Sequence, residues 1–197
     1  MIAILDYGAG NLRSVENTLA EIGSDYRLVA DAPGLRAASK IILPGVGHFG
    51  QMMRALDCMQ VRDALLERIA AGTPFLGICL GLQALFTASE EACDVRGLGV
   101  YEGAVRRFSG QARVPHMGWN ELDMRRSSRL LAGLEARPYV YFAHSYYVPQ
   151  TPMTAATCTY TLSYTAVLED QNIFGVQFHP EKSGAIGLQI MKNFLAL

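Results

Sequence analysis

The stretch Phe75-Leu76-Gly77-Ile78-Cys79-Leu80-Gly81-Leu82-Gln83 runs from an apolar strand-like segment straight into a helical pattern, with a cysteine at the junction. The glycines two residues before and two residues after Cys79 lack the Cβ atoms that would clash in a sharp strand-to-helix turn. A turn of this kind carries the nucleophile of many hydrolases. Because a helix N-terminus offers free N–H groups and partial positive charge, it stabilises a thiolate. We therefore expect Cys79 to be a nucleophile.

A second stretch, Phe178-His179-Pro180-Glu181, supplies the base and the orienting acid that a cysteine nucleophile needs. His179 follows an apolar segment and Cys79 ends another, so both side chains are expected at the carboxyl edge of a parallel sheet. Glu181 is placed to accept a hydrogen bond from His179 Nδ1, which leaves Nε2 to face the sulfur. We expect Cys79 as nucleophile, His179 as base and acid, and Glu181 as the group that orients the imidazole.

Acyl transfer through a thioester also needs two N–H donors aimed at an oxyanion. The Leu80 N–H directly follows the nucleophile and is the first candidate. The loop Pro44-Gly45-Val46-Gly47 can supply the second donor, from Val46 or Gly47, although an ordinary turn can have the same sequence. Gln83 lies four residues after Cys79, so on a helix its carboxamide would lie on the same face, where it could bind a polar substrate.

Apolar segments alternate with helical patterns along the first half of the chain. Strands are expected at residues 2–5, 26–29, 40–43 and 75–78, and helices at 12–22 and 56–71. Residues 138–168 contain no Asp, Glu, Lys or Arg and are rich in tyrosine and valine, which favours antiparallel strands. A strand at 173–178 and a helix at 185–197 complete the pattern. It predicts an α/β fold with a central, mostly parallel sheet flanked by helices, in a single domain spanning residues 1–197.

Composition narrows the class of protein further. The chain has 197 residues, of which 50% are hydrophobic and 18% charged, and its net charge is −1, so no nucleic-acid partner is expected. Residues 69–89 carry no charge, but glycines and Pro74 interrupt them, so we expect no membrane span. The chain has four cysteines, none in a Cys-x-x-Cys spacing, and no secretory signal is recognised. Free thiols in a reducing, cytoplasmic environment are therefore expected.

Two other features remain open. Seven arginines fall between residues 106 and 137, which is compatible with a solvated basic face or with a docking surface for an acidic partner. They are Arg106, Arg107, Arg113, Arg125, Arg126, Arg129 and Arg137. The remaining histidines, His48, His116 and His144, show no metal-ligand spacing, so no metal is expected, and each fits a loop or a partly buried hydrogen bond.

These residues together resemble the class I (triad) glutamine amidotransferases, which use a Cys–His–Glu triad to hydrolyse glutamine to glutamate and ammonia. The nucleophile motif is residues 77–83, and the second motif is residues 178–181. The resemblance implies a flavodoxin-like fold and no cofactor. It also makes His144, Ser145 and Tyr146 candidates for binding the substrate.

Further segments resemble one branch of that family, the glutaminase subunits of imidazole glycerol phosphate synthase in histidine biosynthesis. They are Asp-Tyr-Gly-Ala-Gly-Asn-Leu at 6–12, Pro-His-Met-Gly-Trp-Asn at 115–120, Tyr-Phe-Ala-His-Ser-Tyr at 141–146, and His-Pro-Glu-Lys-Ser at 179–183. The loop at 44–50 contains Gly-Val-Gly where many family members have two adjacent glycines. The branch implies a separate (β/α)₈-barrel cyclase as heterodimer partner, because that barrel needs ~250 residues of its own. By resemblance, Asn11, Trp119 and Lys182 fall at the subunit interface.

The loop around Val46 also suggests regulation, because one peptide orientation would present an N–H to the thioester site and the other a carbonyl. We expect the free subunit to be nearly inactive, with its oxyanion site incomplete until the cyclase is bound. Three different functions remain compatible with the same residues. The chain could serve another synthase, such as pyridoxal phosphate synthase, it could be a redox sensor on the same scaffold, or it could be a cysteine peptidase.

Overall fold

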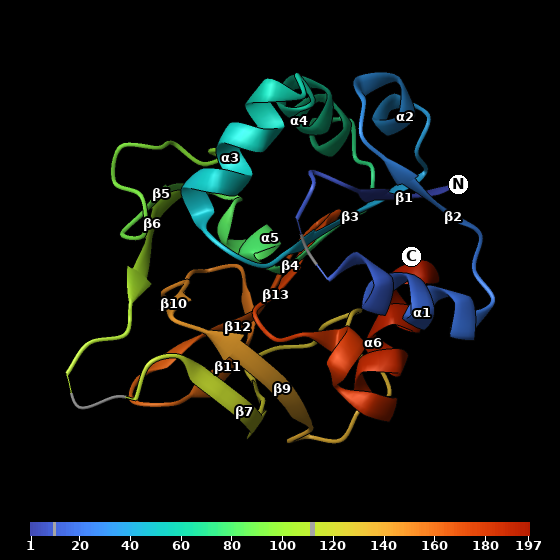
Figure 1. Ribbon diagram of the computed structural model, residues 1–197. Coiled ribbons are helices and arrows are strands. Elements are labelled where there is room, and N and C mark those ends of the chain that lie inside the picture. Colours follow the sequence, from blue (N-terminus) through green and yellow to red (C-terminus); the bar gives the residue numbers. More distant parts are fainter. Residues whose placement is uncertain (10, 111–112) are drawn as a thin grey trace.

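The computed structural model describes residues 1–9, 11–110 and 113–197, so Gly10 of the segment at 6–12 lies outside the described residues. An eight-stranded sheet forms its centre (Figure 1). From edge to edge the strands are β2 (Tyr26–Val29), β1 (Ile2–Leu5), β3 (Lys40–Gly45), β4 (Phe75–Cys79), β13 (Ile173–Val176), β12 (Ser163–Asp170), β11 (Thr154–Thr159) and β8 (Asp123–Met124). The strands from β2 to β13 run parallel, and β12, β11 and β8 continue the sheet antiparallel.

Helices cover both faces of the parallel half, as Figure 1 shows. One face carries α2 (Ala32–Arg36), α3 (Phe49–Cys58) and α4 (Arg62–Ala70), and the other carries α1 (Leu12–Ile22) and α6 (Gly184–Leu195). Alternation along β1 explains the two layers, because successive side chains of a strand point to opposite faces. Ala3 and Leu5 belong to the core under α3 and α4, whereas Ile4 packs with Val15 and Ile190 on the other side.

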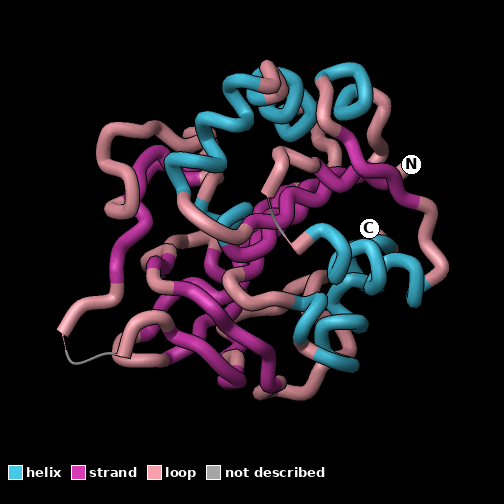
Figure 2. Tube along the Cα trace, in the orientation of Figure 1, coloured by secondary structure: helices cyan, strands magenta, loops and turns pink. Residues whose placement is uncertain are grey.

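Shorter strands lie beyond the main sheet and are magenta in Figure 2. One small sheet contains β5 (Phe86–Ser89), β6 (Tyr101–Arg107) and β10 (Tyr146–Tyr147), and a second pairs β7 (His116–Glu121) with β9 (Tyr139–His144). The helix α5 (Leu80–Gln83) follows β4 directly, and a 3₁₀ turn at Pro180–Lys182 precedes α6. These additions build up the carboxyl edge of the central sheet.

The predicted fold class is confirmed, and so are the strands expected along the parallel half. The prediction of a single helix at 56–71 was wrong. Residues 49–58 form α3 and residues 62–70 form α4, with Gln60 between them at a φ of 57°. Neither glycine nor proline marks this break. The start of α3 was also missed, because its cap is His48, whose Nδ1 accepts from the Gly50 N–H at 3.1 Å.

Most of the arginine-rich segment contacts acidic groups or carbonyls of the chain itself. The ion pairs join Arg106 to Glu90, Arg125 to Asp123, Arg129 to Glu169 and Arg137 to Glu121. The Glu169 side chain is only 8% exposed, so Arg129, which anchors it at 2.8 Å, ties the segment to β12. Burial acts to raise the pKa of Glu169, but hydrogen bonds from Ser128, Arg129 and Leu130 outweigh it and lower that pKa.

Two further expectations concern membranes and cysteines. Within the described residues, no helix combines the length and the apolar character needed to cross a bilayer. Cys58, Cys79, Cys93 and Cys158 are all free thiols, and Cys79 and Cys158 are buried.

Candidate active site

Cys79 is the last residue of β4 and the residue that precedes α5, with a φ of 54° and a ψ of −104°. This left-handed backbone is costly for a side-chain-bearing residue and persists only where its surroundings hold it. The flanking glycines allow it. A Cβ on Gly77 would lie 2.5 Å from the Gly81 carbonyl, and a Cβ on Gly81 would lie 2.0 Å from the Leu43 carbonyl oxygen of β3. The sharp turn therefore requires glycine at both positions.

His179 reaches the same edge of the sheet from β13, which pairs in parallel with β4 and sets Val176 opposite Ile78. The His179 side chain is 3% exposed, and its Nδ1 lies 2.8 Å from Glu181 Oε1. Burial acts to lower the pKa of His179, but hydrogen bonds and charges of Cys79 and Glu181 outweigh it and raise that pKa to about 10. The raised pKa favours the imidazolium form of the ring, which is the form that can pair with a thiolate.

Cys79 and His179 line one cavity of about 170 Å³. This is smaller than the ~300–1,000 Å³ of sites for drug-sized ligands, so it suits a ligand no larger than an amino acid. Nine of the residues predicted for the site line it: Val46, Gly47, Cys79, Leu80, Gln83, His144, Ser145, Tyr146 and His179. Glu181 lies behind His179, with its side chain 2% exposed.

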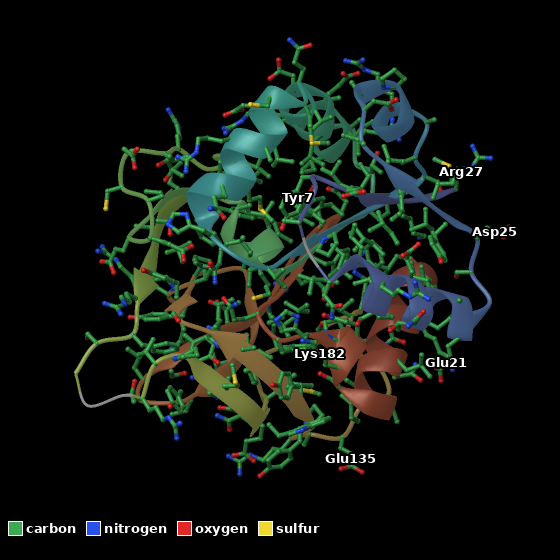
Figure 3. All side chains as sticks on the ribbon, in the orientation of Figure 1. Tyr7, Glu21, Asp25, Arg27, Glu135 and Lys182 are labelled. Carbon is green, nitrogen blue, oxygen red and sulfur yellow. The ribbon has the colours of Figure 1, made fainter. Side chains whose placement is uncertain are left out.

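Tyr7 holds the loop that contains Val46. Its hydroxyl lies 3.4 Å from both the Val46 N–H, from which it accepts, and the Val46 carbonyl oxygen, to which it donates. Burial raises the pKa of Tyr7 to about 12, so the hydroxyl keeps its proton. Because N–H and C=O of a trans peptide point in opposite directions, the Gly45 carbonyl points away from Tyr7. The Val46 N–H is thus bonded to Tyr7 (labelled in Figure 3) instead of being free for an oxyanion, although Val46, Gly47 and Leu80 all line the cavity.

Gln83 lies on α5 as predicted, and its side-chain nitrogen is fully used. It donates to the Tyr146 carbonyl at 2.9 Å and to Gln177 Oε1 at 3.1 Å. An amide nitrogen carries two hydrogens, so Gln83 can offer a ligand only its oxygen. The Tyr146 carbonyl also receives a 2.8 Å bond from His144 Nδ1.

His144 and His116 form a buried polar cluster rather than a metal site. His116 Nδ1 and His144 Nε2 are 3.3 Å apart, and the Tyr164 hydroxyl lies 3.2 Å from both atoms. Burial lowers the pKa of His116 to about 4 and that of His144 to about 3, so both rings are neutral at pH 7. Among the residues that the structure describes, no group of three or more His, Cys, Asp or Glu is arranged to hold a metal ion.

Asn11, Trp119 and Lys182 lie outside the cavity. Asn11 precedes α1, and its Oδ1 accepts from the Ser14 hydroxyl at 2.8 Å. Trp119 is 56% exposed on β7 and packs edge-on against Tyr141 of β9, with ring centroids 6.1 Å apart. Lys182 is placed with its Nζ 5.9 Å from the centroid of the same tyrosine ring, beside the start of α6 in Figure 3.

Three polar residues at the site were missed from the sequence. Glu91 lines the cavity, and its Oε2 accepts from the Phe49 N–H at 2.7 Å. Tyr7 contacts Val46 of the oxyanion loop, and Gln177 contacts the nucleophile Cys79. Gln177 lies two residues before His179, which is a usable signal, whereas nothing in the sequence near Tyr7 or Glu91 indicates what they contact.

The family model described as glutamine amidotransferase class-I matches residues 3–197. The solved structures agree on the fold. One described as a glutamine amidotransferase superposes with a TM-score of 0.76 at 18% identity, covering 99% of this chain and 97% of that one. The structure of PurLQS from Thermotoga maritima gives a TM-score of 0.74 at 20% identity, with the same coverage. The chain belongs to the class I glutamine amidotransferases.

Within that class it belongs to the HisH subunits of imidazole glycerol phosphate synthase. The HisH subunit of Methanothermobacter thermautotrophicus is 47% identical over 198 residues, covering 100% of this chain and 98% of the relative. The HisH subunit of Bacillus cereus is 44% identical, covering 98% and 93%. The predicted family and branch are confirmed.

Proposed function

We propose that this chain is the glutaminase subunit of an imidazole glycerol phosphate synthase. It hydrolyses glutamine to glutamate and ammonia, and the ammonia passes to a separate (β/α)₈-barrel cyclase. The cyclase makes imidazole glycerol phosphate and aminoimidazole carboxamide ribotide in histidine biosynthesis. The observation that carries the proposal is that Cys79, on a strained turn, faces the same cavity as His179, whose Nδ1 is bonded to Glu181. The HisH relatives support this pathway over a different synthase, a redox sensor or a cysteine peptidase.

The geometry supports a two-step acyl transfer. The Cys79 thiolate attacks the side-chain amide carbon of glutamine, and the carbonyl oxygen becomes an oxyanion near the Leu80 N–H and a second N–H supplied by the loop at 44–47. Collapse breaks the C–N bond, and the His179 imidazolium protonates the nitrogen, which leaves as ammonia. Water then attacks the thioester with the neutral His179 as base, which releases glutamate and regenerates the thiolate and the imidazolium. Glu181 accepts a hydrogen bond from Nδ1–H in both forms of the ring, which leaves Nε2 to give and take the proton.

Cavity groups beyond the triad suit the amino-acid end of glutamine. The Glu91 carboxylate and the Gln83 side-chain oxygen are acceptors that fit an ammonium group. Ser145 and Tyr146 line the same wall. We propose that the α-amino group of glutamine binds to the acceptors of Glu91 and Gln83, and that its α-carboxylate lies against residues 143–146.

The contact of Tyr7 with Val46 supports an incomplete oxyanion site in the free subunit. The Val46 N–H is bonded to Tyr7, and the Gly45 carbonyl in the same peptide points away from it. The pairing of Gly45 with Cys79 between β3 and β4 keeps that peptide beside the nucleophile. A rotation of this one peptide would exchange the carbonyl for an N–H, which is a change that partner binding can drive.

The test is ammonia release from glutamine during a titration of this chain with the cyclase and its substrate analogue. We expect slow hydrolysis by the isolated chain and an increase of at least ~10²-fold in the complex, the effect of gaining one oxyanion donor. Equal rates with and without the cyclase would contradict the coupling. No ammonia under any condition would contradict the function itself.

Tyr7→Phe tests the hold on the loop, because it removes the hydroxyl and keeps the ring. Two weak hydrogen bonds to Val46 are lost, so we expect the isolated chain to hydrolyse glutamine about tenfold faster. Tyr101→Phe is the matched control, since it removes a hydroxyl that bonds Asp170 at 3.1 Å away from the cavity. A Tyr7→Phe variant that is slower both alone and in the complex would instead assign Tyr7 to the active arrangement.

We place the cyclase interface on the face that carries Trp119 and Lys182, with Asn11 at its border. The side chains of Trp119 and Lys182 both contact the ring of Tyr141. The Tyr141 carbonyl accepts from the His179 N–H at 2.9 Å, and its N–H donates to the Ser183 hydroxyl at 3.0 Å. Contact at this face could therefore reach the triad. Trp119 is the only tryptophan of the chain, so a fluorine-labelled tryptophan reports on it alone during the same titration. A resonance that does not move on complex formation would exclude it from the interface.

We also propose that residues 1–197 act as one domain in the cytoplasm. The two halves of the chain contribute neighbouring strands, β4 and β13, to one sheet, which supports a single folding unit. The free thiols support a reducing compartment. Limited proteolysis that releases a stable fragment would contradict the single domain.

A further inference from the structure

Gln177 is a polar residue outside the triad whose side chain contacts the nucleophile. It follows β13 directly, is 0% exposed, and its Nε2 lies 3.5 Å from Cys79 Sγ. The distance is within the range of hydrogen bonds to sulfur. A buried amide in van der Waals reach of a reactive sulfur affects the reaction according to which end of the amide faces the sulfur.

The hydrogen bonds around Gln177 fix which end that is. The Tyr146 carbonyl can only accept, so the side-chain nitrogen of Gln83 must face it. The second hydrogen of that nitrogen goes to Gln177 Oε1. Gln177 is therefore left with its nitrogen toward Cys79. Turning either amide over would set two nitrogens or two oxygens against each other, which is costly for buried polar groups.

We propose that Gln177 is a further catalytic residue, which donates a hydrogen bond to the Cys79 sulfur and holds it as a thiolate in position for attack, with Gln83 as its positioning residue. A thiolate accepts hydrogen bonds far better than a thiol, so the bond favours the reactive form. The inference rests on the proposed function for its role in turnover, but the contact to the sulfur can be measured without glutamine.

Two substitutions separate the donor from the shape of the side chain. Gln177→Met fills a similar volume with an unbranched apolar chain and removes the donor. Gln177→Glu keeps the shape and the acceptor for Gln83, but sets an oxygen against the sulfur. Thr157→Val is the control, because it removes a buried polar group, a hydroxyl that has no hydrogen-bond partner in the described structure.

The measurement is the rate of alkylation of Cys79 by iodoacetamide at pH 7, with the modified peptide identified by mass spectrometry apart from Cys58, Cys93 and Cys158. Because a charge-assisted hydrogen bond is lost, we expect the alkylation rate of Gln177→Met to be about tenfold below that of the wild type. The rate of Gln177→Glu should be lower still, and that of Thr157→Val should be unchanged. In the complex, kcat for glutamine should fall in the same order, with KM within about threefold. Thermal unfolding checks that each variant is folded. If Gln177→Glu does not fold, the result for Gln177→Met alone decides the test.

Alkylation of both Gln177 variants at the wild-type rate would overturn the proposal. So would a kcat that stays at the wild-type value while KM alone rises, because that pattern assigns Gln177 to substrate binding. If alkylation follows the expected order but no protein releases ammonia, the proposed function fails and the contact between Gln177 and the sulfur stands.

Discussion

Cys79→Ala is expected to abolish ammonia release from glutamine, with kcat lowered by at least about 10⁴-fold, the loss typical of removing a nucleophile that acts with its base as a unit. The reason is geometric. Among the residues lining the cavity, Cys79 is the one thiol, and it lies on the turn that directs it toward His179. We expect no neighbouring side chain to replace it, since Ser145, which also lines the cavity, lies between β9 and β10 and not on the turn after β4.

The same variant should leave the cyclase reaction with added ammonium salt unchanged, because free ammonia bypasses the glutaminase. Measuring both reactions on one complex separates loss of chemistry from loss of assembly. Cys58→Ser is the matched control, since it alters an exposed free thiol at the end of α3 that does not line the cavity. Residual glutamine-dependent activity above ~1% in Cys79→Ala would contradict the thioester route.

Gly81→Ala is expected to be strongly destabilising. The added Cβ would lie 2.0 Å from the Leu43 carbonyl oxygen, which belongs to the backbone of β3 and cannot rotate away. Either α5 moves off the sheet or β3 distorts, and both change the buried packing at the elbow. We expect a loss of about 3–5 kcal/mol in the free energy of unfolding. For a chain of this size, that corresponds to a Tm lower by roughly 10 °C or more.

Gly50→Ala is the control for this substitution. Gly50 lies in α3, and its added Cβ would meet Ala92 Cβ at 3.0 Å and the flexible Arg54 guanidinium at 3.2 Å. The gain in helix propensity offsets part of that crowding, so the change in stability should be small. Urea unfolding at constant m-value measures both variants. A Tm for Gly81→Ala within about 2 °C of the wild type would mean that the elbow adapts, contrary to the argument from the β3 backbone.

The core of the candidate site could be predicted from the sequence because its signals are local. Glycines around Cys79 and the His179-Pro180-Glu181 run each define their own geometry within a few residues. The break between α3 and α4 could not be predicted, because Gln60 adopts a positive φ without a glycine to mark it.

Residues that act across the sheet were missed for a different reason. The contact of Gln177 with Cys79 depends on the parallel pairing of β4 with β13, and that of Tyr7 with Val46 depends on the arrangement of the β1 and β3 ends. Neither partner lies near the other in sequence. Sequence patterns place such residues in strands or loops but do not say what they touch.

The pairing of β4 with β13 also has a consequence for how the protein is made. Cys79 leaves the ribosome long before residues 173–181, which carry the strand and the imidazole that complete its surroundings. Until those residues emerge, the nascent chain has a cysteine with no base and no neighbouring strand to hold its backbone. The nucleophile therefore becomes reactive only near the end of synthesis, when Cys79 meets His179 some hundred residues further along the chain. An incompletely made chain is expected to have no glutaminase activity.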